Sequence, residues 1–364
     1  MRVAIIGAGA IGLGAAAYLS ERGHDPIVWS PGGKRTAELA KGAPLVATGA
    51  VEGEFRPGVA ASCADALAGA EAVLVALPGN GHRMVFDAMA PHLMPAQIVL
   101  VSGHLSFGAL YLARHLSARG VAVPIVAWGT TVTTGRQRGP TSVNVANLRK
   151  KVDIATVPLS ASARGLDICR TLFGDRFVPR DDLLAIAVSN LNPQNHMGIA
   201  LCNLTRMERG ESWSQNENLT DAVGRLMEAL DAERLAIAGK LGVAVRTIRE
   251  HYSLSFNVPP GSVGEMARRM HERGDATLGP TSLETRYVLE DVPYGLVPTA
   301  WLGRLVGAPA TLHEAGIAIL GAAYGRDFAA ENDLLLALDF DHLPLDKLRR
   351  LARDGWAMAP MATG

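Results

Sequence analysis

Short apolar, β-branched runs recur along the first half of the chain, and segments with helical spacing separate them. Runs of this kind predict buried parallel strands. The expected strands cover residues 2–6, 26–30, 71–77, 97–102 and 124–128, with one further strand and its helix over 152–165. Because strands and helices alternate, we predict a Rossmann-type α/β domain with a doubly wound parallel sheet over residues 1–180.

The pattern changes after the polar, proline-containing stretch 173–182. From residue 183 to about 240 the apolar positions follow helical spacing and there is almost no strand signal. One long helix is expected to begin after Thr220, a favourable N-cap, and to stop at Gly242. We therefore predict an all-α C-terminal domain over residues 181–364.

The first expected strand runs directly into the glycine-rich stretch GAGAIGLG and then into a helix. In this arrangement Gly7 permits a tight turn, Gly9 lets a backbone approach a diphosphate, and Gly12 lets the helix pack close to the strand. The diphosphate would rest on the N-terminus of the helix. The sequence therefore predicts a dinucleotide site. The residues assigned to its turn and helix start are Gly7, Gly9, Ala10, Ile11 and Gly12.

Three polar side chains follow the second expected strand. An NAD site usually has Asp or Glu about 20 residues past the first glycine, where the acid binds the ribose hydroxyls. This chain has Ser30, Lys34 and Arg35 there instead, which would supply a hydroxyl and two cations to a 2′-phosphate. We expect NADP (NADPH) as the cofactor, with NAD as the alternative. Lys34 and Arg35 could instead cap the next helix or face water.

Polar or glycine-rich loops follow the other expected strands, and strand ends line the cofactor crevice in this fold. Leu77 and Pro78 begin a loop that we assign to the cofactor as a lid over the diphosphate. Thr130 and Thr131 form a hydroxyl cluster that we assign to substrate. His82 and His104 also lie in such loops, and we expect them to bond to backbone rather than to take part in chemistry.

An amide and an imidazole interrupt an apolar run in LNPQNHMGIAL, residues 191–201. If Pro193 opens a helix, Asn192 is a good N-cap, and this would fully explain the asparagine. On the same helix His196, Ile199 and Asn203 would share one face. Because this helix opens the second domain, where two-domain dehydrogenases present residues to their cleft, His196 is a candidate acid–base group.

A second polar island, residues 283–298, contains Arg286 and Asp291 among apolar and aromatic neighbours. A carboxylate that binds one imidazole nitrogen fixes the tautomer and raises the basicity of the ring. An arginine offers a two-pronged donor to a carboxylate. Asp291 is therefore a candidate partner for His196, and Arg286 a candidate ligand for a substrate carboxylate.

At these residues the sequence resembles the octopine/nopaline (opine) dehydrogenases. The resemblance covers nearly the whole chain: a glycine-turn domain, an Asn-x-x-x-His pair (Asn192, His196), and an Arg-x-x-x-x-Asp pair (Arg286, Asp291) that leads into VPYGL. It implies an NAD(P)H-dependent enzyme that reductively joins the amino group of an amino acid to the carbonyl of a 2-oxo acid. It also implies that His196 and Asp291 are the acid–base dyad, Asn192 a polar partner and Arg286 a carboxylate ligand. Met197 and Gly198 follow the histidine where the family often has proline.

Three other functions remain open at this point. Another two-domain reductase, such as a ketopantoate or glycerol-phosphate reductase, would call for a lysine near the domain junction, and RKK at 149–151 lies too early. An imine reductase without a 2-oxo acid partner would have no need for Arg286. A non-catalytic NADP-binding sensor would have no need for His196 and Asp291 to meet.

Composition and charge narrow the choice of partners. The chain is 48% hydrophobic and 19% charged, enough apolar material for two cores. Residues 1–180 hold 18 Lys and Arg against 11 Asp and Glu, whereas residues 181–364 hold 17 against 24. A positive first half suits an anionic cofactor, but the charge is too diffuse for nucleic acid.

The expected partners are therefore small molecules, with no nucleic acid and no membrane. We expect a cytoplasmic protein because no apolar run is long enough to cross a bilayer and no leader precedes the first strand. A homodimer is a possible assembly. The three cysteines, Cys63, Cys169 and Cys202, are too widely spaced to predict a disulfide framework or a metal cluster.

Overall fold

The protein is described by a computed structural model that covers residues 1–275 and 277–357. The chain divides into two compact units. The first consists of Met1–Ile186 and the segment from Ala337 onward, and the second of Ala187–Leu336. This differs from the division expected at residue 180, most of all because the end of the chain returns to the first unit.

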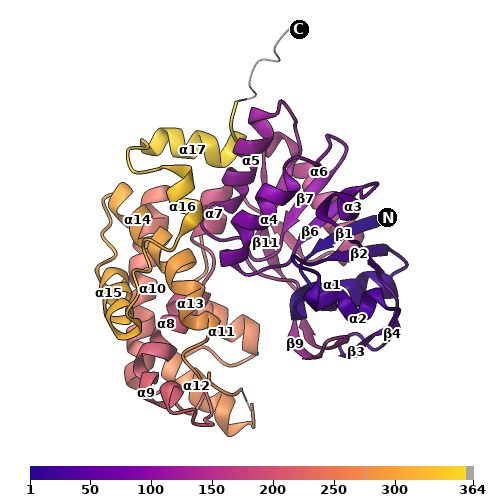
Figure 1. The fold of residues 1–364 in the computed structure, drawn as a ribbon. Coiled ribbons are helices and arrows are strands. Elements are labelled where there is room, and N and C mark those ends of the chain that lie inside the picture. Colours follow the sequence, from indigo (N-terminus) through magenta and orange to yellow (C-terminus); the bar gives the residue numbers. More distant parts are fainter. Residues whose placement is uncertain (276, 358–364) are drawn as a thin grey trace. The chain divides into compact units, whose positions relative to one another are not determined.

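The first unit is built on a mostly parallel sheet of eight strands in the order β12-β11-β8-β7-β6-β1-β2-β5 (Figure 1). All pairs run parallel except β8 with β11. The expected Rossmann-type α/β fold is confirmed. The strands are β1 Arg2–Ile6, β2 Asp25–Trp29, β5 Gly58–Val59, β6 Ala72–Val75, β7 Ile98–Val101, β8 Ile125–Trp128, β11 Val152–Val157 and β12 Phe177–Pro179.

The pairing register brings four strand ends level. Ile6 at the end of β1 pairs with Trp29 of β2 and with Val75 of β6, and Val75 pairs with Val101 of β7. The loops that follow these strands therefore leave the sheet at one edge, where ligands bind in open α/β sheets.

A second sheet of four strands, in the order β4-β3-β10-β9, was not expected from the sequence. Its strands are β3 Leu45–Gly49, β4 Gly53–Phe55, β9 Thr133–Gly139 and β10 Ser142–Leu148. Helix α1, Ala10–Glu21, packs on β9 and β10, and a Cβ at Gly14 would lie 3.4 Å from Val145 Cγ2. Because α1 contacts both sheets, its residues 12–19 are all buried, which explains its long run of small and apolar side chains.

The other helices of the first unit are α2 Ala37–Ala40, α3 Cys63–Leu67, α4 His82–Met89, α5 Gly108–Ala118, α6 Ser162–Phe173 and α17 Leu345–Asp354, with short 3-10 turns η1 Lys34–Thr36, η2 Gly79–Gly81 and η3 Leu159–Ala161. Helix α17 belongs here because the C-terminal segment docks on α5. Trp356 Nε1 donates to the Leu110 carbonyl at 2.9 Å, and the Phe340 ring meets the Phe107 ring edge-on. These contacts explain why the helical domain does not extend to the end of the chain.

The second unit is helical, apart from an isolated bridge between Ser214 and Leu278 among the residues described. Helix α10 lies where the sequence placed it: the Thr220 hydroxyl accepts the Val223 N–H, and Gly242 ends the helix at φ 76°. None of the helices that the structure describes is both long enough and apolar enough to cross a lipid bilayer. The helices are α7 Leu183–Ala187 and α16 Asp333–Leu338 at its two ends, and α8 Asn192–Cys202, α9 Leu204–Glu208, α10 Asp221–Leu241, α11 Ile248–Phe256, α12 Val263–Glu272, α13 Arg286–Leu289, the π-helix η4 Val292–Leu296, α14 Val297–Leu305 and α15 Thr311–Tyr324.

Candidate active site

Helix α8 carries the expected amide and imidazole, but Asn192 is not its N-cap. The helix begins at Asn192, with Leu191 in the cap position. The backbone N–H of Asn192 is satisfied by the Asn190 side chain, whose Oδ1 accepts it at 3.0 Å. The Asn190 side chain therefore accepts a backbone N–H at the helix start, the role that the sequence interpretation gave to Asn192. The Asn192 side chain is half-buried on the helix surface.

Close approaches on three sides fix α8 in the helical unit. A Cβ at Gly198 would lie 2.5 Å from Met227 of α10. A Cβ at Gly316 of α15 would overlap the Met197 side chain, and one at Gly295 of η4 would overlap the Pro193 ring. The residues that follow His196 thus have a packing role: Met197 fills the space left by Gly316, and Gly198 admits α10.

His196 and Asp291, 95 positions apart in the sequence, meet in the helical unit. His196 Nδ1 lies 2.6 Å from Asp291 Oδ2. The histidine side chain is 14% exposed and the carboxylate 1%. Asp291 directly precedes the π-helix η4, a rare element that is frequent at functional sites. Because Asp291 engages Nδ1, the other ring nitrogen, Nε2, is the one that can exchange a proton with a ligand.

An aromatic ring that the sequence interpretation missed covers one face of His196. The phenol of Tyr287, on α13, stacks on the imidazole. Its hydroxyl donates to Gln215 Oε1 at 2.9 Å, which anchors the far end of the ring. The sequence offers one signal for Tyr287, its position next to Arg286 in the polar island. A single aromatic residue among apolar neighbours usually indicates a core position, so this signal is weak.

Arg286 lies near the pair, but its first partner is a different acid. Its Nε is 3.3 Å from Glu290 Oε2, and its side chain is 57% exposed. Desolvation opposes the charged form of the Arg286 guanidinium. The negative charges of Glu290 and Asp291 outweigh this effect and hold the pKa of Arg286 above its ordinary value. Arg286 is therefore a permanent cation beside the His196–Asp291 pair. Asn203, expected on the His196 face, instead donates to the Ile199 carbonyl at 3.0 Å near the end of α8.

In the first unit the glycine turn has the features that a dinucleotide needs. Gly7 has φ 116°, and a Cβ there would lie 2.6 Å from the Ala76 carbonyl oxygen. A Cβ at Gly12 would overlap the Gly7 carbonyl, so only glycine lets α1 start this close to β1. Gly9 is the N-cap, α1 begins with Ala10 and Ile11, and its first turn has no acid and no side-chain cap. The N–H groups of this helix start suit a diphosphate.

Arg35 lies beside this turn. Its Nη1 is 3.8 Å from the position that a Cβ of Gly9 would take. Lys34 and Arg35 are both exposed on η1, whereas Ser30 is buried. These two cations follow Gly32 and Gly33, which both have positive φ and so permit the tight turn after β2.

The loops after β6 and β7 contain two fully buried histidines that bond to backbone, as expected. Leu77 and Pro78 lead into η2, and the Leu77 carbonyl accepts a hydrogen bond from His82 Nε2 at 3.0 Å. His104 Nε2 accepts the Ala109 N–H at 3.2 Å. Burial lowers the pKa of His82 to about 4 and that of His104 to about 3, so both rings are neutral at ordinary pH.

The threonines assigned to substrate lie in the first unit and Arg286 in the second. The Thr131 hydroxyl donates to the Thr133 carbonyl at 2.8 Å and accepts from Arg149 Nη1 at 2.7 Å. Arg149 therefore holds Thr131 in place.

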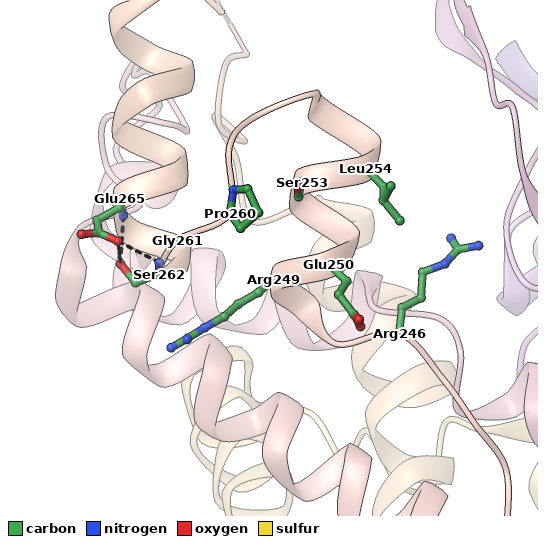
Figure 2. Close-up of a pocket in the computed structure, with 9 residues that line it drawn as sticks. All are labelled: Arg246, Arg249, Glu250, Ser253, Leu254, Pro260, Gly261, Ser262 and Glu265. Carbon is green, nitrogen blue, oxygen red and sulfur yellow. Dashed lines mark hydrogen bonds between the residues drawn. The ribbon is translucent and has the colours of Figure 1, made fainter.

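A pocket of about 910 Å³ between α11 and α12 is separate from the His196–Asp291 pair (Figure 2). Its charged side chains have local partners: Arg249 bonds Glu228 at 2.6 Å, and Glu265 accepts the Ser262 hydroxyl at 3.1 Å. Neither His196 nor Asp291 lines this pocket. The residues that do are Arg246, Arg249, Glu250, Ser253, Leu254, Pro260, Gly261, Ser262 and Glu265.

Comparison with known proteins identifies the two halves of the chain. Residues 179–324 match the family model for NAD/NADP octopine/nopaline dehydrogenase, alpha-helical domain, and residues 3–158 match that for ketopantoate reductase PanE/ApbA. An opine dehydrogenase of Arthrobacter sp. (strain 1C) is 29% identical over 353 residues, which span 95% of this chain and 97% of that protein. The helical half of the chain thus matches the octopine/nopaline dehydrogenase family, and nearly the whole chain is similar to an opine dehydrogenase. These similarities indicate an NAD(P)-dependent oxidoreductase acting on CH–NH bonds.

Solved structures of the family share this fold. Octopine dehydrogenase in complex with NADH and agmatine superposes with a TM-score of 0.78 at 15% identity, over 96% of this chain and 97% of that one. Yersinopine dehydrogenase with NADP+ bound superposes with a TM-score of 0.67 at 14% identity, over 92% and 97%. These similarities support a nicotinamide dinucleotide as the cofactor, and the glycine turn of the first unit fits it.

Proposed function

We propose that the protein is an NADPH-dependent opine dehydrogenase that joins the amino group of an amino acid to the carbonyl carbon of a 2-oxo acid. The proposal rests on the hydrogen bond between His196 Nδ1 and Asp291 Oδ2, in a helical unit that matches the octopine/nopaline dehydrogenase family model. Condensation releases water and gives an imine. Reduction of its C=N bond then takes up one hydride and one proton and gives a secondary amine.

His196 and Asp291 would handle the protons of this reaction. Asp291 accepts the hydrogen bond from Nδ1–H, so Nε2 can take up a proton. The imidazolium then donates that proton to the carbonyl oxygen as water leaves, or to the nitrogen as the C=N bond is reduced. The carboxylate stabilises the imidazolium that forms whenever Nε2 takes up a proton. The nicotinamide cofactor, when bound, supplies the hydride. A positioned acid–base group of this kind contributes roughly 10²–10⁴ in rate.

Polar side chains around the pair would hold the substrates. We assign Arg286 to the carboxylate of the 2-oxo acid, because its guanidinium stays charged and is more than half exposed beside Asp291. Asn192 lies four positions before His196 on α8, so its amide projects on the same side of the helix. Thr130 and Thr131 are the proposed hydroxyl contacts from the first unit.

The preference for NADPH over NADH is part of the proposal. Arg35 near Gly9, Lys34 beside it, and Ser30 at the end of β2 offer two cations and a hydroxyl where an NAD enzyme would have an acid. A 2′-phosphate would form charge-assisted hydrogen bonds with these cations.

A ketopantoate-type reductase is the second candidate, because residues 3–158 match that family. That activity would call for a lysine near the junction of the two units. The sequence contains no lysine between Lys151 and Lys240, so the start of the helical unit offers none. The start of the helical unit carries His196, bonded to Asp291, instead, which favours the opine dehydrogenase.

The test is an NADPH-consumption screen over pairs of 2-oxo acids and amino acids, with each partner also supplied alone and with His196→Ala as the inactive control. Consumption that needs both partners supports the proposal. Consumption with a 2-oxo acid alone would indicate a keto-acid reductase, and consumption with a preformed imine alone an imine reductase. No turnover with any pair, together with tight NADPH binding, would indicate a sensor.

A further inference from the structure

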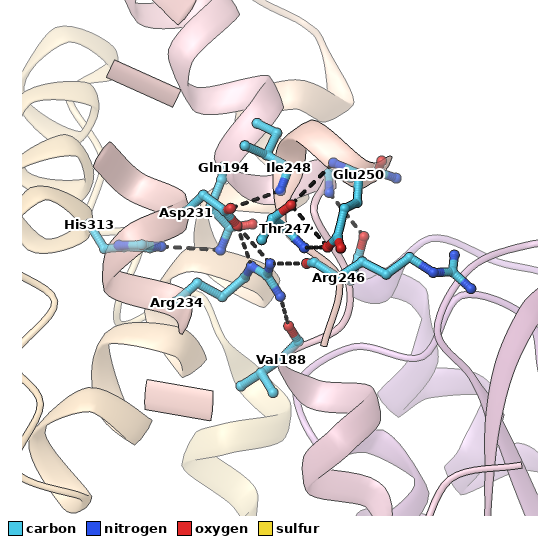
Figure 3. Close-up of polar contacts among 11 residues, drawn as sticks. Val188, Gln194, Asp231, Arg234, Arg246, Thr247, Ile248, Glu250 and His313 are labelled. Atoms are coloured by element: carbon cyan, nitrogen blue, oxygen red, sulfur yellow. Dashed lines mark hydrogen bonds and ion pairs between the residues drawn. The ribbon is translucent and has the colours of Figure 1, made fainter. Parts of the chain in front are cut away.

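A buried chain of three side chains links α10, α15 and α8, and the proposed chemistry does not use it. His313 of α15 is 0% exposed. Its Nδ1 lies 2.8 Å from Glu233 Oε2 of α10. Its Nε2 lies 3.1 Å from Gln194 Nε2 of α8 (Figure 3).

The direction of each hydrogen bond follows from Glu233. Its carboxylate also accepts the backbone N–H groups of Leu312, at 2.7 Å, and His313, at 3.2 Å. Desolvation opposes the charge, but these bonds and the one from the His313 ring hold the pKa of Glu233 below its ordinary value. The carboxylate is therefore charged, so His313 Nδ1 donates to it. In a neutral ring Nε2 is then an acceptor, and the Gln194 amide N–H donates to it.

This bond is the polar contact that holds Gln194. The side chain is 1% exposed, and its Oε1 has no hydrogen-bond partner among the residues described. Gln194 lies two positions before His196, and residues two apart on a helix point to nearly opposite sides. The three side chains thus hold the first turn of α8 on the side opposite the face that bears His196.

A second buried cluster holds the segment before α8 (Figure 3). Arg234 of α10 bonds Asp231 at 2.6 and 2.9 Å and donates to the carbonyls of Val188 and Arg246. Asp231 in turn accepts the Ile248 N–H at 2.8 Å. A buried pair of this kind fixes geometry more than it adds stability. Helix α8 is therefore constrained both at its entry and in its first turn.

We propose that Glu233, His313 and Gln194 form a positioning relay that sets the placement of His196. This inference rests on the proposed function, in which His196 is the acid–base group. A misplacement of about 1 Å at such a group can cost about 10²-fold in rate. None of the three residues is proposed to touch substrate; they act through the backbone of α8.

The test compares Gln194→Leu, which keeps the volume and removes the donor, with Ser262→Ala, which removes the cap of α12. The Ser262 hydroxyl accepts the Glu265 N–H at 3.3 Å and lies outside both clusters, so its loss destabilises the same unit away from α8. We expect Gln194→Leu to lower kcat about tenfold with little change in the KM for NADPH, and Ser262→Ala to lower the Tm alone.

A second readout does not depend on turnover. The proton shared by His196 and Asp291 should give a downfield NMR signal, and Gln194→Leu should shift or broaden it whereas Ser262→Ala should not. If Gln194→Leu does not fold, His313→Phe replaces it, with His313→Gln as the conservative variant that restores a donor and an acceptor. Unchanged kcat and an unchanged signal would overturn the relay. If His196→Ala itself keeps full turnover, the proposed function fails, and the NMR signal then decides the relay alone.

Discussion

The phenol ring of Tyr287 lies flat on the imidazole of His196, with ring centroids 3.6 Å apart and an interplanar angle of 8°. The imidazole is therefore held on one face by Tyr287 and at Nδ1 by Asp291, so its plane and its tautomer are both fixed. Gln215 Oε1 accepts a hydrogen bond from the Tyr287 hydroxyl and so anchors the far end of this ring.

Removal of the stacked ring should impair catalysis more than removal of its hydroxyl. Tyr287→Leu is expected to lower kcat about tenfold, because the imidazole gains freedom to rotate away from the reacting position. Tyr287→Phe keeps the ring and loses only the bond to Gln215, so it should retain most of the activity. Steady-state kinetics of the two variants makes the comparison, and equal losses in both would show that the hydroxyl, not the ring, is what matters.

His196→Ala should abolish turnover without affecting the cofactor. We expect kcat to fall by about 10²–10⁴, because the proton donor is lost. Asp291→Asn keeps the shape of the partner but removes the charge that stabilises the imidazolium, so a loss of about 10² is expected. Fluorescence titration with NADPH is the control. A parallel loss of NADPH binding in His196→Ala would make the histidine a structural residue.

The double variant Lys34→Ala with Arg35→Ala should change the cofactor preference. A charge-assisted hydrogen bond to phosphate is worth about 1.5–3 kcal/mol, so the KM for NADPH should rise by about tenfold or more while that for NADH changes little. Lys41→Ala is the matched control, since Lys41 is an exposed cation paired with Glu38 at 2.8 Å. An unchanged ratio of the two KM values would refute the NADPH preference.

Gly295→Ala should strain the junction between η4 and α8. The added Cβ would overlap the rigid ring of Pro193, so one of the two segments must shift, at a cost of about 1–3 kcal/mol in the free energy of unfolding. Gly239→Ala provides the contrast, because a Cβ there meets nothing within 4 Å on helix α10. That variant should gain about 0.5–1 kcal/mol from helix propensity. Urea unfolding measures both, and a neutral Gly295→Ala would contradict the close packing.

Acid should destabilise the first unit through its buried histidines. Burial lowers the pKa of His82 to about 4 and that of His104 to about 3 from an ordinary value of 6.5. Below pH 6.5 His82 and His104 take up protons in the unfolded chain but stay neutral in the folded unit. The free energy of unfolding therefore falls as the pH falls. The loss should approach about 3 kcal/mol for each histidine near pH 4.

Urea unfolding at a series of pH values tests this expectation. His104→Asn keeps an acceptor for the Ala109 N–H and removes one titrating group, so its stability should fall less steeply with acid. His92→Asn, at an exposed site, should follow the wild-type curve. If His104→Asn also followed that curve, His104 would have no part in the acid response.

Six of the eight strands of the first sheet were predictable because each has a short, largely apolar run that ends at a polar loop. The other two, β5 and β12, have only two and three residues and give no such signal. The second sheet was not predictable, because β9 has the polar sequence TTGRQRG and β10 alternates with half-exposed positions. Helix α17 was expected as part of a helical domain, but its amphipathic pattern says only that it buries one face, not against which partner. Docking of that kind depends on tertiary contacts such as Trp356 with Leu110.

The site was predictable where a local rule or the family resemblance applied. His196 and Asp291 were singled out by their pattern, although only the folded chain shows the 2.6 Å contact between them. Of the two interpretations of Asn192, the N-cap was wrong, because the sequence could not show that α8 starts at Asn192 and that Asn190 Oδ1 accepts its backbone N–H. Tyr287 was missed because its role depends on a ring stacked across two helices, a relationship that no spacing encodes.

The chain passes between the two units twice, after Ile186 and again after Leu336. The helical unit is therefore one uninterrupted stretch, whereas the first unit needs both ends of the polypeptide. During synthesis from the N-terminus the helical unit has all its residues first, and the nucleotide-binding unit can close only when the segment that carries Trp356 has left the ribosome. A nascent chain stalled before that point would present α5 without its cover, as a natural target for chaperones.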